Sequence, residues 1–314
     1  MTSLSGKVCL VAGATRGAGR GIAVALGEQG ATVYCSGRSV DGAVATAGRT
    51  ETIDGTARLV AAAGGQGIAV RCDHTKEDEV QALMDRIAAT HGRLDVLVND
   101  VWGGDRLVAW QKPFWEAPAD DLRRLLDQAV VSHVLTTQKA VPLLGQGSLV
   151  VEVTDGDSFA YRGNLFYDLV KTMVIRLAFA WHEELQARGV SAVAVTPGFL
   201  RSEAMLDLFG VTEATWREHG AKDPDFLHSE TPLFVGRGVA ALAADPHIAR
   251  RSGRVVASWT LAREYGFTDA DGSRPDWGAH VRARYGDVFR PLDDAAYASW
   301  EGWARLKAQV QLPA

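Results

Sequence analysis

Runs of consecutive apolar residues recur along the chain and alternate with longer stretches in which apolar residues have a helical spacing. The runs are apolar at nearly every position, which is typical of strands buried on both faces of a parallel sheet. Strands are therefore predicted over residues 8–12, 31–35, 67–72, 94–98, 148–153, 190–195 and 253–256. Helices are predicted between them, over residues 17–28, 56–63, 77–90, 119–144 and 166–188. This alternation predicts an α/β fold, a Rossmann-type doubly wound parallel sheet.

Two segments interrupt this alternation of strands and helices. Residues 39–52 are rich in glycine and threonine and are expected to form a surface loop. From about Arg263 a tail continues beyond the last predicted strand, too aromatic for a disordered segment and too short for a second domain. The tail carries the tryptophans Trp277, Trp300 and Trp303. We expect one domain over residues 1–262 and a C-terminal extension, residues 263–314, that packs on the core or on a neighbouring subunit.

Composition narrows the class of protein. The chain has 314 residues, of which 47% are hydrophobic and 23% charged, and its formal net charge is -5. An acidic chain of ordinary globular composition gives no reason to expect a nucleic acid or a membrane as partner. Cys9, Cys35 and Cys72 lie in apolar runs, and their spacing matches neither a zinc site nor a redox pair. With a short polar N-terminus in place of a signal peptide, these features predict a cytoplasmic protein without a metal site.

The first apolar run leads through a glycine-rich turn directly into the first predicted helix. Glycine allows a tight turn and lets backbone N–H groups at a helix N-terminus approach a pyrophosphate. A strand before and a helix after the glycines are the context that such a site requires. The turn therefore predicts a dinucleotide-binding site that contains Gly13, Thr15, Arg16, Gly17, Ala18 and Gly19.

The residue that follows the second apolar run distinguishes two dinucleotides. An NAD site usually carries an acidic residue for the ribose 2′-hydroxyl, whereas an NADP site carries an arginine for the 2′-phosphate. This chain has Arg38 at that place, and Arg16 in the glycine-rich turn is a second cation. A guanidinium group suits a phosphate because it donates parallel hydrogen bonds. NADP(H) is therefore the preferred cofactor, while the nearby Asp41 leaves NAD(H) open.

Tyr167 and Lys171 are four residues apart in a predicted helix, so they share one face of it. The pKa of a free tyrosine is ~10, and a nearby ammonium group favours the phenolate and lowers that pKa. A tyrosine tuned in this way acts as a general acid/base on an alcohol or a carbonyl. We therefore predict Tyr167 as the acid/base and Lys171 as the residue that lowers its pKa.

Together with three further motifs, these features resemble the short-chain dehydrogenase/reductase family, in its order and approximate spacing, over residues 5–260. The further motifs are Asp73 after the third run, Asn99 after the fourth, and Pro197-Gly198 after the sixth. Within the family, residues 114–118 and 145–147 make the chain most similar to the DHRS1-like branch.

The resemblance implies cofactor contacts at the matching positions. Asp73 is expected to approach the adenine, and Asn99 to support the cofactor loop and the central strand. Lys171 is expected to hold the nicotinamide ribose, and Ser202 to contact the nicotinamide carboxamide. Pro197-Gly198 completes the cofactor-binding set.

The family's substrate-orienting serine commonly lies thirteen residues before the tyrosine, which places Thr154 in that role. Its hydroxyl has the same donor and acceptor capacity, although the extra methyl group crowds the site. The family's relay asparagine corresponds to Ala129, so the relay is absent, carried by water or supplied by His133. A further departure is Trp102, which is expected to border the pocket.

The leading interpretation is an NADP(H)-dependent oxidoreductase that interconverts a small-molecule carbonyl and alcohol by hydride transfer. Two alternatives stay open: a lyase, isomerase or dehydratase on the same fold, and a non-catalytic NADP-binding protein. The resemblance also implies a homodimer or homotetramer, and a lid over residues 199–230. Residues expected to line the substrate pocket are Trp102, Trp110, Asp155, Phe159, Tyr161, Phe199 and Leu206.

Overall fold

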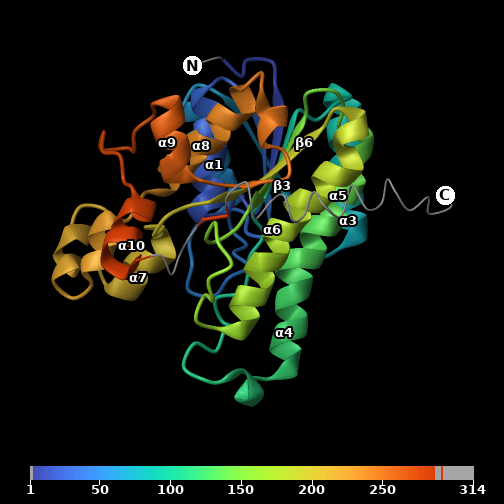
Figure 1. Cartoon of the computed structure of the whole chain (residues 1–314). Helices are drawn as coiled ribbons and strands as arrows, with labels where there is room; N and C mark the ends of the chain where they lie inside the picture. The colour runs from blue at the N-terminus through green and yellow to red at the C-terminus, as the bar shows by residue number, and fades with distance from the viewer. Residues whose placement is uncertain (1–2, 287–290, 293–314) are drawn as a thin grey trace, which may run out of the picture.

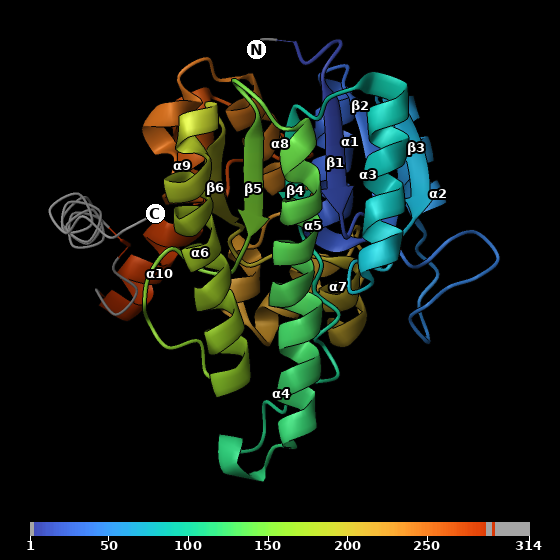
Figure 2. The same cartoon turned by 90° about the vertical axis from the view of Figure 1, so that its right-hand side faces the viewer.

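In the computed structural model, residues 3–286 and 291–292 are described. Within these residues, seven parallel strands form one sheet in the order β3-β2-β1-β4-β5-β6-β7 (Figure 2). They are β1 (Val8–Ala12), β2 (Thr32–Gly37), β3 (Gln66–Arg71), β4 (Val96–Asn99), β5 (Leu149–Val153), β6 (Ser191–Thr196) and β7 (Val255–Ala257). Each predicted run overlaps one of these strands, and the predicted doubly wound parallel sheet is confirmed.

Helices cover both faces of this sheet (Figures 1 and 2). Successive residues of a strand point to opposite faces, so both faces of each central strand must be apolar. Val11 and Val98 pack in the core beneath one helical layer, whereas Leu10 and Leu97 pack in the core beneath the other. One layer holds α1 (Gly17–Glu28), α2 (Ile53–Ala62), α8 (Pro232–Ala244) and α9 (Ser258–Tyr265), and the other holds α3 (Glu77–His91), α5 (Ser132–Ala140) and α6 (Leu165–Leu185).

The sequence pattern did not predict α8, which packs directly against α1. A Cβ atom at Gly21 would lie 2.0 Å from the carbonyl oxygen of Pro232, and one at Gly236 would lie 2.4 Å from the carbonyl oxygen of Gly21. The two backbones therefore approach so closely that only glycine fits at the crossing. This close contact fixes the start of α1, where the glycine-rich turn lies.

The prediction of one continuous α-helix over residues 119–144 is wrong. The segment divides into α4 (Ala119–Leu126), a π-helical turn over Asp127–Val131, α5, and a 3-10 turn over Val141–Leu143. Such π-helical turns occur mostly within longer helices and often near functional sites. Beyond the sheet, α4 extends as a projection of the molecule (Figure 2).

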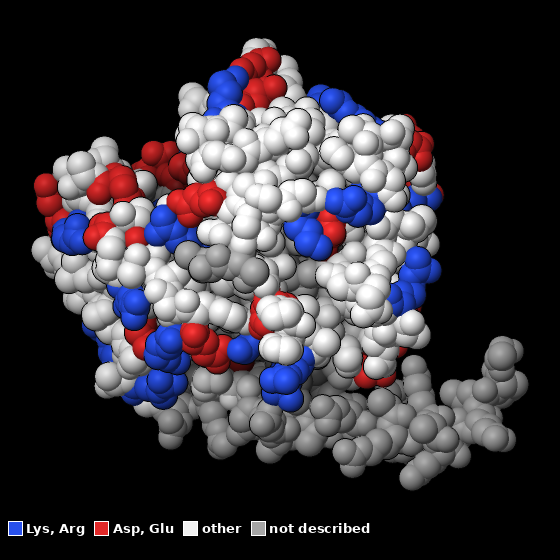
Figure 3. All heavy atoms as spheres, turned by 90° about the horizontal axis from the view of Figure 1, so that it is seen from above, with Lys and Arg blue, Asp and Glu red and all other residues white. Residues whose placement is uncertain are grey.

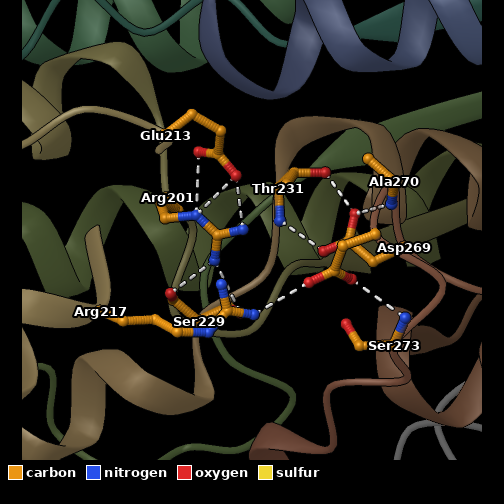
Figure 4. Close-up of polar contacts among 9 residues, drawn as sticks. Arg201, Glu213, Arg217, Ser229, Thr231, Asp269, Ala270 and Ser273 are labelled. Carbon is orange, nitrogen blue, oxygen red and sulfur yellow. Dashed lines mark hydrogen bonds and ion pairs between the residues drawn. The ribbon is translucent and has the colours of Figure 1, made fainter. Parts of the chain in front are cut away.

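Residues 197–286 add the short helices α7 (Glu203–Phe209) and α10 (Trp277–Tyr285), which were not predicted. Figure 4 shows how this region is joined: Asp269 accepts a hydrogen bond from the Thr231 backbone N–H at 2.9 Å. Nearby, Arg201 pairs with Glu213 at 2.7 Å. The indole of Trp277 lies 5.6 Å from the ring of Phe199. Trp300 and Trp303 lie outside the described residues.

On the face seen in Figure 3, basic and acidic side chains are interspersed in small groups. Among the described residues, no helix is long and apolar enough to cross a membrane. The same part of the chain holds no cluster of three or more histidine, cysteine or acidic side chains suited to a metal ion.

Candidate active site

The glycine-rich turn lies between β1 and α1, beside the end of β4. Gly13 has a φ of +95°, and a Cβ atom there would lie 2.4 Å from the carbonyl oxygen of Asp100. A Cβ atom at Gly19 would lie 2.4 Å from the carbonyl oxygen of Gly13. Side chains are therefore excluded at both positions, and the start of α1 is left as bare backbone.

Carboxylates occupy the N–H donors at the start of α1. The Gly17 N–H donates to Glu203 Oε2 at 2.8 Å, and Glu203 Oε1 lies 3.2 Å from Arg20 Nη1. A hydrogen bond from the Gly19 backbone also stabilises the Asp100 carboxylate. These carboxylates stand where an anion is favoured by the free N–H groups and the helix dipole. The donor set thus fits the pyrophosphate of a dinucleotide.

The other predicted residues of the turn support this arrangement. The carbonyl oxygen of Thr15 accepts from Arg20 Nη2 at 2.7 Å, and the extended backbone of Arg16 forms the N-cap of α1. Ala18 is buried against the core. Neither Glu203 nor Asp100 was predicted as a residue of this site. Glu203 comes from a helix that is distant in the sequence.

Two predicted cofactor residues meet at the ends of neighbouring strands. Arg38 directly follows β2, and its Nη1 lies 4.0 Å from Asp73 Oδ2. The Arg38 side chain is 42% exposed, so it can still reach a ligand. Asp41, which kept NAD(H) open, is held by Thr52 at 2.6 Å and by Arg58 at 2.7 Å.

Asn99 anchors a buried polar network at the end of β4. Its Nδ2 donates to Thr137 Oγ1 at 2.9 Å and to Glu152 Oε1 at 2.7 Å. Glu152 Oε2 lies 2.7 Å from His133 Nδ1, and the other ring nitrogen of His133 lies 3.0 Å from the carbonyl oxygen of Val101. Sequence reasoning missed Glu152, although a carboxylate inside the apolar run of β5 was a signal.

This network bears on the proton relay. Both ring nitrogens of His133 are engaged, with Glu152 and with the backbone of Val101. His133 is therefore a hydrogen-bonded residue of the buried network that holds the loop after β4. Ala129 is buried in the π-helical turn.

Tyr167 and Lys171 project from the first turns of α6, which Asn164 caps by accepting the Phe166 N–H at 3.0 Å. Lys171 Nζ lies 5.6 Å from the centroid of the Tyr167 ring. It also lies 4.5 Å over the ring of Trp102. The predicted neighbourhood of phenol and ammonium is therefore present in the structure.

Thr154 and the Tyr167 hydroxyl have different hydrogen-bond partners in the structure. Thr154 is buried, and its hydroxyl donates to the backbone carbonyl oxygen of Lys171 at 2.8 Å. The Tyr167 hydroxyl instead donates to Asp155 Oδ2 at 2.8 Å. The residue next in the chain thus contacts the phenol, because the end of β5 turns the Thr154 side chain toward α6.

The expected lowering of the tyrosine pKa is also corrected. Burial raises the pKa of the Tyr167 phenol well above its ordinary value of 10.0, and the Asp155 carboxylate raises it further. Burial lowers the pKa of Lys171 and raises that of Asp100 to about 7. In this structure Tyr167 is therefore a neutral phenol.

Only part of the expected aromatic pocket surrounds Tyr167. The rings of Trp102 and Trp110 lie 5.4 and 5.0 Å from its ring. Phe159 and Tyr161 are more than half exposed. Phe199 packs in an aromatic cluster with Phe209, Phe226 and Trp277.

Pro197 and Gly198 follow β6, as predicted. The Gly198 N–H donates to Glu230 Oε2 at 2.8 Å, and Ser258 Oγ donates to the same oxygen at 2.6 Å. Burial raises the pKa of Glu230 to about 8. Ser202 caps α7 by accepting the Met205 N–H at 3.4 Å, beside the Glu203 that reaches α1. Sequence reasoning also missed Glu230.

Comparison with known proteins agrees with this geometry. The family model described as short chain dehydrogenase matches residues 7–209. Dehydrogenase/reductase SDR family member 1 of Mus musculus is 37% identical over 277 residues, which cover 86% of this chain and 85% of the mouse protein. The Homo sapiens protein of the same name is 36% identical over 283 residues, with the same coverage of 86% and 85%.

Solved structures share the fold. A short chain dehydrogenase from Mycobacterium thermoresistibile superposes with a TM-score of 0.71 at 20% identity, covering 88% of this chain and 93% of that one. A putative dehydrogenase from Xanthomonas campestris gives a TM-score of 0.70 at 24% identity, covering 88% and 96%. The resemblance read from the motifs is thus confirmed, and the chain belongs to the short-chain dehydrogenase/reductase family of NAD(P)-dependent oxidoreductases.

Proposed function

We propose that the protein is an NADP(H)-dependent oxidoreductase that interconverts a small-molecule carbonyl and the corresponding alcohol. The observation that carries the proposal is the placement of Tyr167 and Lys171 side by side, with the Tyr167 hydroxyl engaged in a hydrogen bond. A neutral phenol that is already hydrogen-bonded can exchange a proton with a substrate oxygen.

The cofactor would be held at the start of α1 and at the ends of β2 and β3. The N–H groups of Gly17 and Gly19 suit its pyrophosphate, since they already bind carboxylates. Arg38 is partly exposed, whereas Asp41 is paired with Arg58. Both observations favour a cofactor with a ribose 2′-phosphate over one with a 2′-hydroxyl. When bound, the nicotinamide supplies or accepts the hydride.

The roles of the chain's own residues follow from their contacts. Tyr167 exchanges the proton of the substrate oxygen, and Lys171 places a positive charge beside it. Thr154 positions Lys171, because its hydroxyl donates to the backbone carbonyl oxygen of that residue. Trp102 and Trp110 form an aromatic wall beside Tyr167, which favours a substrate with an apolar face near its reacting carbon.

Replacement of Tyr167 by phenylalanine tests the assignment. A panel of ketones and secondary alcohols is followed by NADPH absorbance. Tyr167→Phe should lower turnover by about a hundredfold or more, because the proton donor is gone. NADPH binding, measured by quenching of protein fluorescence, should stay close to that of the unaltered protein. Retained turnover would show that Tyr167 is not the acid/base, and product without an absorbance change would favour the non-redox alternative.

We further propose a homodimer or homotetramer in the cytoplasm. Val131 and Val134 are large apolar residues exposed near the start of α5, and Leu169 is exposed on α6. Contact with a second copy would bury them. The three cysteines are buried and unpaired, which suits a reducing compartment. Light scattering at several protein concentrations measures the oligomeric state.

A further inference from the structure

The side chain that contacts the Tyr167 phenol is a carboxylate, from the residue that follows Thr154. Asp155 Oδ2 accepts the hydrogen bond of the Tyr167 hydroxyl at 2.8 Å. The neighbouring hydroxyl of Thr154 donates to the backbone carbonyl oxygen of Lys171 at 2.8 Å. The group that contacts the phenol is therefore an acceptor when ionised, whereas a serine or threonine could also donate.

The position of Asp155 is set by contacts on both sides. Its backbone carbonyl oxygen accepts from Arg162 Nε at 2.5 Å, and Arg162 is itself held by Asp168 at 2.9 Å. The next residue, Gly156, donates its N–H to Thr196 Oγ1 at 2.7 Å. These bonds tie the loop after β5 to β6 and α6, so the carboxylate is held against Tyr167.

We propose that Asp155 is a second proton-transfer residue, which exchanges the proton of Tyr167 while Tyr167 exchanges the proton of the substrate. The inference rests on the proposed function, because it assigns a partner to the acid/base of that reaction. Tyr167 then passes protons between substrate and Asp155 and stays a phenol in both resting states.

The transfers balance in both directions. In alcohol oxidation, the substrate C–H bond breaks and its hydride goes to the oxidised nicotinamide, while the O–H proton passes to Tyr167 Oη. The phenol O–H bond breaks at the same time, and its proton forms an O–H bond on Asp155. The products are a carbonyl, the reduced nicotinamide and a protonated Asp155, which then releases its proton to solvent. In carbonyl reduction every transfer runs backwards.

The proposal also specifies the form of the substrate that the site binds. An ionised Asp155 accepts hydrogen bonds and offers none, so it favours a substrate that carries hydroxyl donors. A carbonyl oxygen needs a donor, which the site provides when Asp155 is protonated or when the phenol turns away from it. With the phenol donating to Asp155, the pair is therefore arranged to accept the hydroxyl of an alcohol.

Other charged groups face this pair and contribute to its titration. Lys171 faces it from α6, and Arg162 from the loop that precedes α6. Asp105 acts on it from the loop after β4. A variant at Asp155 leaves these groups in place, so a change in the behaviour of Tyr167 reports the loss of its partner.

The first test needs no substrate. The ionisation of Tyr167 is measured by ultraviolet titration of the full chain, as the difference from Tyr167→Phe. Asp155→Asn should shift this ionisation down by about one pH unit or more, because a negative charge next to the phenol is lost. Asp105→Asn is the matched control: it removes a carboxylate that acts on Tyr167 without a hydrogen bond to it, and it should shift the ionisation much less. An unchanged titration in Asp155→Asn would overturn the proposal.

The second test measures proton transfer during turnover, on the panel alcohol that the unaltered protein oxidises fastest. Asp155→Asn should lower kcat about a hundredfold near neutral pH, with NADPH binding retained as proof of folding. Its rate should then rise into the alkaline range, where the phenol ionises by itself. Asp155→Ser should behave in the same way but lose less activity. Equal kcat and an unchanged pH profile in Asp155→Asn would overturn the proposal, whereas no turnover by the unaltered protein would refute only the proposed function.

Discussion

We propose that a single guanidinium group, that of Arg38, distinguishes NADP(H) from NAD(H). Arg38 follows β2 directly, is partly exposed, and lies 4.0 Å from Asp73. A hydrogen bond to a charged group contributes about 1.5–3 kcal/mol, which corresponds to about ten- to hundredfold in affinity. Only a cofactor with a 2′-phosphate would gain this from Arg38.

Replacement of Arg38 should therefore separate the two cofactors. Arg38→Ser should raise KM for NADPH about ten- to hundredfold and leave KM for NADH within about threefold. Steady-state kinetics with each cofactor makes the measurement. The matched control is Arg71→Ser, at the end of β3, where the arginine pairs with Glu79. An equal rise in KM for NADPH and for NADH would show that Arg38 does not bind the 2′-phosphate.

Residue types and spacing located Tyr167, Lys171 and the glycine-rich turn, because these motifs are local in sequence. They did not distinguish Thr154 from Asp155. Which of two adjacent side chains faces the phenol depends on the path of the loop after β5, and spacing alone does not contain that path. The same limit explains why Glu203 was missed, since its contact with Gly17 joins residues far apart in the chain.

At the scale of elements, α7 contacts the proposed cofactor site through its first residue. Glu203 accepts the Gly17 N–H at the start of α1 and pairs with Arg20. A bound pyrophosphate would compete for the same N–H group and would be repelled by the carboxylate. The contact therefore opposes cofactor binding until α7 or the Glu203 side chain moves.

A neutral side chain at this position should bind the cofactor more tightly. Glu203→Gln should lower the Kd for NADPH about three- to tenfold, because the competing charge at the helix N-terminus is removed. Fluorescence titration gives the Kd for NADPH of the unaltered protein and of Glu203→Gln. Asp207→Asn serves as control, since this carboxylate lies on α7 but pairs with Arg49. Unchanged or weaker binding in Glu203→Gln would contradict the competition.

The elements themselves were predicted unequally, for a physical reason. The bounds of α1 match the prediction, because a glycine-rich turn marks its start. The helix that packs on it, α8, is apolar on nearly all sides and contains Gly236 and Gly238. Its glycines weaken any helical signal in the sequence, yet Gly236 is required by the close crossing with α1. The helix α8 is therefore fixed by its tertiary packing on α1, which local helix propensity does not predict.

At the scale of the whole molecule, a buried carboxylate links separate parts of the fold. Glu230 is 1% exposed and bonds to Gly198 after β6 and to Ser258 at the start of α9. Its other oxygen, Oε1, has no hydrogen-bond partner. Burial therefore favours the protonated acid and raises the pKa of Glu230 from 4.5 to about 8.

This shift makes stability depend on pH in a defined direction. Between 4.5 and about 8, the folded state holds a proton on Glu230 that the unfolded state has lost. The stabilisation is therefore complete below the lower value and is lost as pH rises toward the upper one, by up to about 1.4 kcal/mol of unfolding free energy per pH unit. Asp100, whose pKa is raised to about 7, acts in the same direction.

Urea unfolding at a series of pH values measures this dependence. In Glu230→Gln the fall in stability from mildly acidic to mildly alkaline pH should be shallower than in the unaltered protein, because one of the protons that the folded state retains in this range is removed. The fall that remains should diminish further when Asp100→Asn is added. Glu264→Gln is the control, since this carboxylate lies in a half-exposed pair with Arg251 and should leave the slope unchanged. An identical slope in Glu230→Gln and the unaltered protein would show that Glu230 is already ionised in the fold, so that its contacts with Gly198 and Ser258 hold a carboxylate rather than an acid.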